Sequence, residues 1–94
     1  MNLSSHLDKL REICRKNDVV MLGVFGSVAR GEDTDSSDVD LLVRLGKPMG
    51  LEFFALEHEF EEALGRKVDL VTEASLSKYI RDDVLADLRI LYEV

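Results

Sequence analysis

Two aspartates, Asp38 and Asp40, alternate at the start of an apolar run that continues from Leu41 to Val43. Aspartate is depleted in β-strands because its short polar side chain competes for backbone hydrogen bonds. Successive side chains of a strand point to opposite faces, which places Asp38 and Asp40 on one face, about 6.5–7 Å apart. Two carboxylates this close repel each other unless a cation or a proton lies between them. Because Mg²⁺ prefers oxygen ligands, a Mg²⁺ site at the mouth of a strand is the simplest explanation of the pair.

A second group that could do chemistry is the turn at Gly26 and Ser27, which follows an apolar run at residues 19–25. A strand that runs into such a turn and a short helical segment presents free backbone N–H groups to an anion. Gly26 lets the backbone approach closely, and the Ser27 hydroxyl can donate to a phosphate oxygen. Arg30, one turn further along, can act as a forked cationic donor to the same anion.

A third carboxylate, Asp69, lies within the apolar run at residues 68–71. Val68 and Leu70 share one face of a strand there, which leaves Asp69 alone on the other face. For any single aspartate of the three, a solvated position at a strand end is the better interpretation. Three of them on one face, beside an anion-binding turn, favour a metal site instead.

The acidic residues between the turn and the second strand, Glu32, Asp33 and Asp35, are interpreted as solvated and are assigned no role. Two of them also exclude a P-loop. The six residues that begin at Gly26 have the G-x-x-x-x-G spacing, but carboxylates follow where that motif requires lysine and serine or threonine. A negative charge in place of the phosphate-binding lysine repels a phosphate, so these residues do not form a P-loop.

Residues 26–31 (GSVARG) followed by residues 37–41 (SDVDL) resemble the GSxARG…SDxDL signature of minimal nucleotidyltransferases in the DNA polymerase β-like superfamily. No signature residue is substituted. Residues 68–71 (VDLV) resemble the strand that carries the third carboxylate of this family, which is a less specific pattern. The resemblance in length and in the order of the elements covers essentially the whole chain.

The resemblance implies a role for each of these residues. Asp38 and Asp40 would hold the Mg²⁺ that chelates a nucleotide triphosphate. Asp69 would join them around a second Mg²⁺ that activates the acceptor hydroxyl, because two metal ions can stabilise both oxygens of an in-line displacement. The Gly26–Ser27 turn would bind the triphosphate, and Arg30 would support the charge that develops on the pyrophosphate.

The resemblance also implies an activity and a partner, namely transfer of AMP from ATP to a hydroxyl group. Small members of this family often accompany a HEPN-domain RNase toxin as its antitoxin, so the acceptor is expected to be a tyrosine hydroxyl of that toxin. Two alternatives remain open. One is an antitoxin that neutralises its toxin by binding alone, and the other is an enzyme that adenylylates a small molecule such as an aminoglycoside.

The hydrophobic periodicity predicts the elements that hold these residues in place. We expect an α/β fold with a small mixed sheet, helices on one face and the carboxylates on the open face. Phe53 and Phe60 lie on one stripe of the second long helix, and Phe54 beside them is interpreted as core. The predicted elements are a helix at 2–17, strands at 19–25, 38–45 and 68–71, a helix at 50–64, a helix capped by Ser75 or Ser77, and an edge strand at 88–94.

Composition limits the remaining possibilities. A chain of 94 residues is expected to form one domain, 1–94. Its 12 basic and 19 acidic residues give a net charge of −7, which disfavours direct binding of nucleic acid or an anionic membrane and suits a basic partner. The single cysteine, Cys14, is expected to be buried and cannot form an internal disulfide. Together with the absence of a recognisable signal peptide or membrane span, this predicts a cytoplasmic protein.

Overall fold

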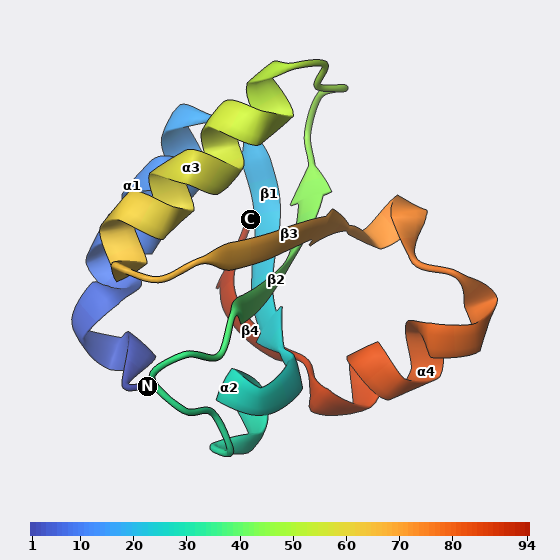
Figure 1. Cartoon of the computed structure of the whole chain (residues 1–94). Helices are drawn as coiled ribbons and strands as arrows, with labels where there is room; N and C mark the ends of the chain where they lie inside the picture. The colour runs from blue at the N-terminus through green and yellow to red at the C-terminus, as the bar shows by residue number, and fades with distance from the viewer.

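The computed structural model describes residues 1–94 and is organised around one four-stranded sheet (Figure 1). The sheet has the order β3-β2-β1-β4. β1 pairs antiparallel with both β2 and β4, whereas β2 and β3 are parallel, so the predicted mixed sheet and the edge strand at the end of the chain are confirmed. The strands are β1 (Val19–Phe25), β2 (Val39–Leu45), β3 (Val68–Thr72) and β4 (Arg89–Glu93).

The helices lie close to the positions that the apolar spacing predicts. The first predicted helix is divided into a short 3₁₀ turn and α1. None of the helices combines the length and the hydrophobicity that a membrane span requires. The helices are η1 (Leu3–His6), α1 (Leu7–Lys16), α2 (Gly26–Arg30), α3 (Glu52–Leu64), η2 (Glu73–Ser75) and α4 (Lys78–Asp87).

The main core lies between one face of the sheet and the helices α1 and α3 (Figure 1). It consists of 16 buried residues, with Leu10 of α1, Phe60 of α3 and Leu41 of β2 all completely inaccessible. Alternate residues along β2 and β3 supply this core because successive strand side chains point to opposite faces. The same alternation turns Asp40 and Asp69 away from α1 and α3.

A second, smaller apolar cluster covers part of the opposite face. Leu76, which precedes α4, and Val84, which lies in α4, pack there against buried strand residues. These are Met21 of β1 and Leu42 of β2. The expectation of helices on one face only is therefore wrong for α4, although it is confirmed for α1 and α3. On this face Asp69 of β3 remains exposed and Asp40 of β2 is partly buried.

The aromatic stripe of α3 is only partly buried. Phe60 is inaccessible and Phe53 packs at the margin of the main core. Phe54, which was expected to be core, is 67% exposed and meets the Phe53 ring edge to face, with 6.5 Å between the ring centroids. One residue along a helix corresponds to a rotation of about 100°, and this turns Phe54 off the buried face.

Candidate active site

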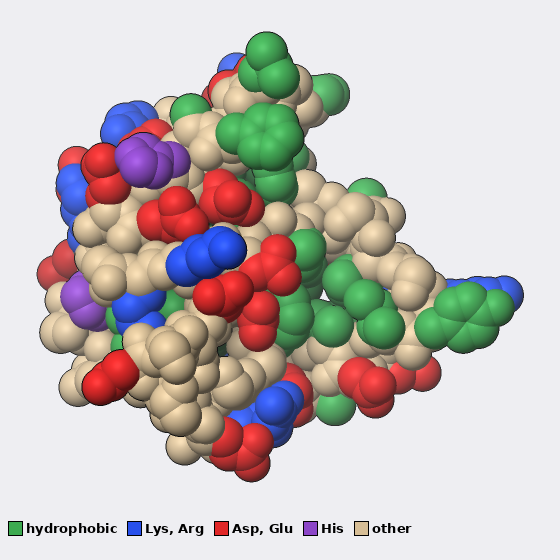
Figure 2. Space-filling model, in the orientation of Figure 1, with side chains coloured by type: hydrophobic (Ala, Val, Ile, Leu, Met, Phe, Trp, Pro, Cys, Tyr) green, Lys and Arg blue, Asp and Glu red, His purple; other side chains and the backbone are tan.

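The parallel register of β2 and β3 brings two of the three aspartates together. Asp40 and Asp69 are direct partners in this register, so their side chains leave adjacent strands on the same face. Asp38 lies immediately before β2, two residues ahead of Asp40, and is exposed. Acidic side chains gather in the middle of this side of the molecule (Figure 2). The sheet thus places Asp40 and Asp69 at one end of one face, and Asp38 directly precedes the first residue of β2.

The electrostatics of this group centre on Asp40, which is partly buried. Burial raises the pKa of the Asp40 carboxyl above its ordinary value, and the negative charges of Asp69 and Asp38 raise it further. Arg30 opposes this rise in part. A divalent cation would remove the repulsion and offers the hard charge that oxygen ligands suit, so the donor set fits Mg²⁺.

The carboxylates do not form a finished ligand cluster by themselves. No group of three or more acidic, histidine or cysteine side chains in the structure is arranged closely enough to hold an ion. Like charges without a cation between them repel and stay apart. Binding of an ion at this end of the sheet would therefore require small side-chain rotations of the aspartates.

The glycine turn is in direct contact with the Asp40 carboxylate. Gly26 has a φ of +71°, a conformation that side-chain-bearing residues rarely adopt, and a Cβ added to it would collide with the Oδ2 atom of Asp40. Phe25, the residue before the turn, is the register partner of Asp40. The Ser27 hydroxyl makes no hydrogen bond within the chain and remains available as a donor. The turn is therefore adjacent to Asp40.

Arg30, the third residue expected at the triphosphate, is held by two carboxylates. Its Nε donates to Glu32 over 2.9 Å, and its Nη1 donates to Asp87 of α4. The guanidinium lies close enough to Asp40 to lower the pKa of that carboxyl. These two contacts leave further N–H donors of the guanidinium unused, so Arg30 can still donate to a phosphate oxygen.

The loop that precedes Asp38 contains a contact that the sequence analysis missed. Asp33 was interpreted as solvated, and this is wrong because its side chain is only 6% exposed. It accepts hydrogen bonds from Arg66 over 2.9 Å and from the amino group of Met1 over 3.0 Å. The Arg66 contact is the main reason why the pKa of Asp33 lies below its ordinary value. No local pattern signals this pair, since its members are 33 residues apart.

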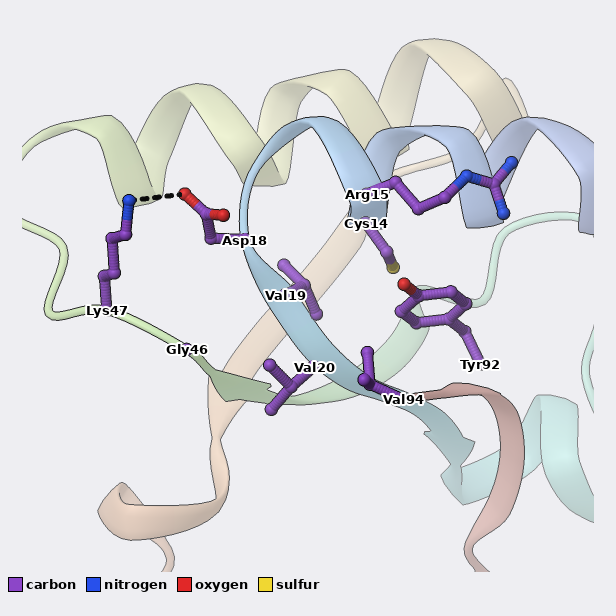
Figure 3. Close-up of a pocket in the computed structure, with 9 residues that line it drawn as sticks. All are labelled: Cys14, Arg15, Asp18, Val19, Val20, Gly46, Lys47, Tyr92 and Val94. Carbon is purple, nitrogen blue, oxygen red and sulfur yellow. Dashed lines mark ion pairs between the residues drawn. The ribbon is translucent and has the colours of Figure 1, made fainter.

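A separate hollow lies at the other end of β1, away from the aspartates, and is lined in part by Cys14, Lys47 and Tyr92 (Figure 3). The predicted burial of Cys14 is confirmed. Burial raises the pKa of its thiol to about 12, so the thiolate needed for nucleophilic attack is not populated near neutral pH. Lys47 pairs with Asp18 over 3.4 Å at the rim. This hollow offers no reactive group.

Replacing Asp40 with asparagine is expected to leave the metal-free stability at pH 7 unchanged or to raise it. The folded state raises the pKa of Asp40 above 3.8, so it holds the proton to a higher pH than the unfolded chain does. Ionisation of Asp40 therefore lowers the free energy of unfolding as the pH rises from 3.8 through the raised pKa. Thermal melts in EDTA at a series of pH values should show the variant's advantage disappearing in acid. A marked fall in the Tm of Asp40→Asn at pH 7 would contradict this assignment of charge repulsion.

Residues 7–91 match the family of nucleotidyltransferase domains, and the match covers almost the entire chain. The chain belongs to the nucleotidyltransferase domain family. A relative in the same family is the protein adenylyltransferase MntA of Thermococcus cleftensis, which is 42% identical over 87 residues. The alignment covers 92% of this chain and 85% of that relative. The resemblance carried by GSVARG and SDVDL is thereby confirmed at the level of the family.

Solved structures share the fold of this nucleotidyltransferase. A chain of a toxin-antitoxin crystal structure with AMP-PNP superimposes with a TM-score of 0.80 at 24% identity, covering 94% of this chain and 73% of that one. A chain of the complex between tri-AMPylated Shewanella oneidensis HEPN toxin and MNT antitoxin has a TM-score of 0.75 at 21% identity, with 99% and 74% covered. Identities this low establish the common architecture alone.

Proposed function

We propose that this nucleotidyltransferase moves AMP from ATP to a tyrosine hydroxyl of a HEPN-domain toxin, with Mg²⁺ as cofactor, and thereby acts as the antitoxin. The observation that carries the proposal is the pairing of Asp40 with Asp69 directly beside the Gly26 turn. A metal-assisted displacement at phosphorus requires neighbouring carboxylates that can bind the metal ions. It also requires a nearby group that can bind the phosphates, and the Gly26 turn is in that position.

Each side chain has a separate role in the proposed reaction. Asp38 and Asp40 would hold the ion that accompanies the triphosphate, and Asp69 would share a second ion and accept the proton of the attacking hydroxyl. The acceptor oxygen bonds to the α-phosphorus, the bond from that phosphorus to the bridging oxygen breaks, and pyrophosphate leaves. Magnesium ions held by these aspartates would stabilise the negative charge on the attacking and leaving oxygens.

The turn is proposed to orient the triphosphate. The backbone at Gly26 can approach an anion closely because it has no Cβ, and the unpartnered Ser27 hydroxyl can donate to a phosphate oxygen. Arg30 would donate to a phosphate oxygen through the N–H groups that Glu32 and Asp87 leave free. These contacts set the α-phosphorus in line with the acceptor, and such orientation accounts for much of the catalysis of phosphoryl transfer.

The partner is proposed from the relatives and from the charge of the chain. One relative is named a protein adenylyltransferase, and structures with the same fold come from toxin-antitoxin complexes, one of them with a tri-AMPylated HEPN toxin. A net charge of −7 is complementary to the basic surface that an RNase needs to bind RNA. We place the reaction in the cytoplasm, where ATP is available and a single cysteine stays reduced.

The test uses the full chain, a purified HEPN-domain partner, Mg²⁺ and ATP labelled at the α-phosphate. We expect label on the toxin, a mass gain equal to AMP on a tyrosine, and loss of RNase activity. ATP labelled at the γ-phosphate should leave no label, and EDTA should stop the reaction. Neutralisation of the toxin without label would establish an antitoxin that acts by binding. Label on an aminoglycoside, with none on the toxin, would establish a small-molecule adenylyltransferase.

A further inference from the structure

We propose that Arg66 is a positioning residue for Asp38, acting through the loop backbone that enters β2. The inference rests on the proposed function, in which Asp38 is a metal ligand. Arg66 lies in the bend between α3 and β3, far from Asp38 in sequence, and only 15% of its side chain is exposed. Its contacts are directed at the residues that lead into Asp38.

The need for such a residue follows from the limits of the sheet. Asp40 and Asp69 lie inside paired strands, so the ladder fixes their backbones. The pairing begins with Val39, whose N–H donates to the carbonyl of Lys67 over 2.9 Å. Asp38 precedes this first bond, and its side chain makes no hydrogen bond or ion pair within the chain. Its position therefore depends on what holds the loop before it.

Arg66 holds that loop at three points. One terminal nitrogen donates to the Asp33 carboxylate over 2.9 Å. The other donates to the carbonyl of Ser37 over 2.6 Å and to that of Thr34 over 2.5 Å. Ser37 is the residue directly before Asp38, so the backbone is fixed on both sides of Asp38, by Arg66 and by Lys67.

The orientation of the guanidinium supports a specific role. Its Nε is buried and has no hydrogen-bond partner. A buried donor without a partner costs free energy. The guanidinium is therefore oriented so that its terminal nitrogens reach the loop acceptors, while its Nε remains without a partner. The planar fork of arginine can reach three acceptors at fixed angles, whereas the ammonium of lysine is a point charge that cannot span them. Because Arg66 immediately precedes Lys67, the same contact also ties the loop to the start of the strand that carries Asp69.

The test measures Mn²⁺ affinity of the full chain by electron paramagnetic resonance, without any turnover. Outer partners of metal ligands typically change affinity by 10–100-fold, and we expect Arg66→Met to weaken Mn²⁺ binding by about 10-fold. Arg66→Lys should lie between this variant and the wild type. Arg81→Met, which removes an exposed arginine of α4 that has no ion pair, should leave the affinity unchanged.

A double-mutant cycle identifies Asp38 as the residue through which Arg66 acts. Asp38→Asn alone should weaken Mn²⁺ binding, and adding Arg66→Met to it should change the affinity little further. Millimolar guanidinium should restore Mn²⁺ binding to the single variant Arg66→Ala. It should not restore Mn²⁺ binding to the double variant that also carries Asp38→Asn. Full additivity of the two substitutions would overturn the proposal.

Two further outcomes separate this inference from the proposed function. If the wild type binds no Mn²⁺, or if Asp38→Asn leaves its affinity unchanged, the proposed metal site and the role of Arg66 both fail. If Asp38→Asn weakens binding while the Arg66 variants bind normally, only the role of Arg66 fails. Circular dichroism checks folding. If Arg66→Met does not fold, Asp33→Ala, which removes one of the three contacts between Arg66 and the loop, is tested in its place.

Discussion

Asp40→Asn is expected to reduce AMP transfer to the HEPN partner by at least about 100-fold, since a bound metal ion supplies several kcal/mol of charge stabilisation and each 1.4 kcal/mol is tenfold in rate. The charges of both other carboxylates, Asp38 and Asp69, raise the pKa of Asp40, and Asp40 also contacts the Gly26 turn. Asparagine keeps the shape of the side chain but removes one anionic oxygen. Initial rates at saturating ATP over a Mg²⁺ titration measure the effect.

The matched control is Asp35→Asn, because Asp35 is an exposed acid of the neighbouring loop with no hydrogen bond or ion pair. It removes the same unit of charge and should retain the wild-type rate. Toxin labelling by Asp40→Asn at the wild-type rate would refute the assignment of Asp40 as a metal ligand. Equal losses in both variants would indicate a general effect of net charge.

Gly26→Ala is expected to reduce AMP transfer by a similar factor, for a steric reason. Its Cβ would meet the Asp40 carboxylate, so either the carboxylate or the turn must move from its position. The left-handed backbone at φ +71° adds a strain of about 1–2 kcal/mol for a residue with a Cβ. The variant should therefore be moderately less stable and far less active, with weaker binding of both Mg²⁺ and ATP.

Gly31→Ala separates these two contributions. Gly31 has a φ of +72°, almost the same as Gly26, but an added Cβ would have nothing within 4 Å. Both variants should lose the stability that the left-handed backbone costs a residue with a Cβ, and only Gly26→Ala should lose the activity. Comparable rates in the two variants would show that contact between the turn and Asp40 is not needed for the reaction.

The residues of the candidate site were predictable because their placement follows from local rules. Strand alternation alone turns Asp40 and Asp69 away from the apolar face, whichever strands become neighbours. The left-handed backbone at Gly26 likewise follows a type of turn that glycine favours. The mixed sheet and the order of its elements came from hydrophobic periodicity and from the resemblance of the signature to a known family.

Other features depend on contacts between segments that are distant in sequence, and only the tertiary structure decided them. The register between β2 and β3 makes Asp69 the direct partner of Asp40. The ion pair between Asp33 and Arg66 joins two loops, which turns an apparently solvated acid into a partly buried one. Periodicity identifies the face of an element but not the neighbour that covers it, so the packing of α4 on the carboxylate side was not predicted. Long-range packing therefore determined how the acidic group is held, whereas local chemistry determined which residues belong to it.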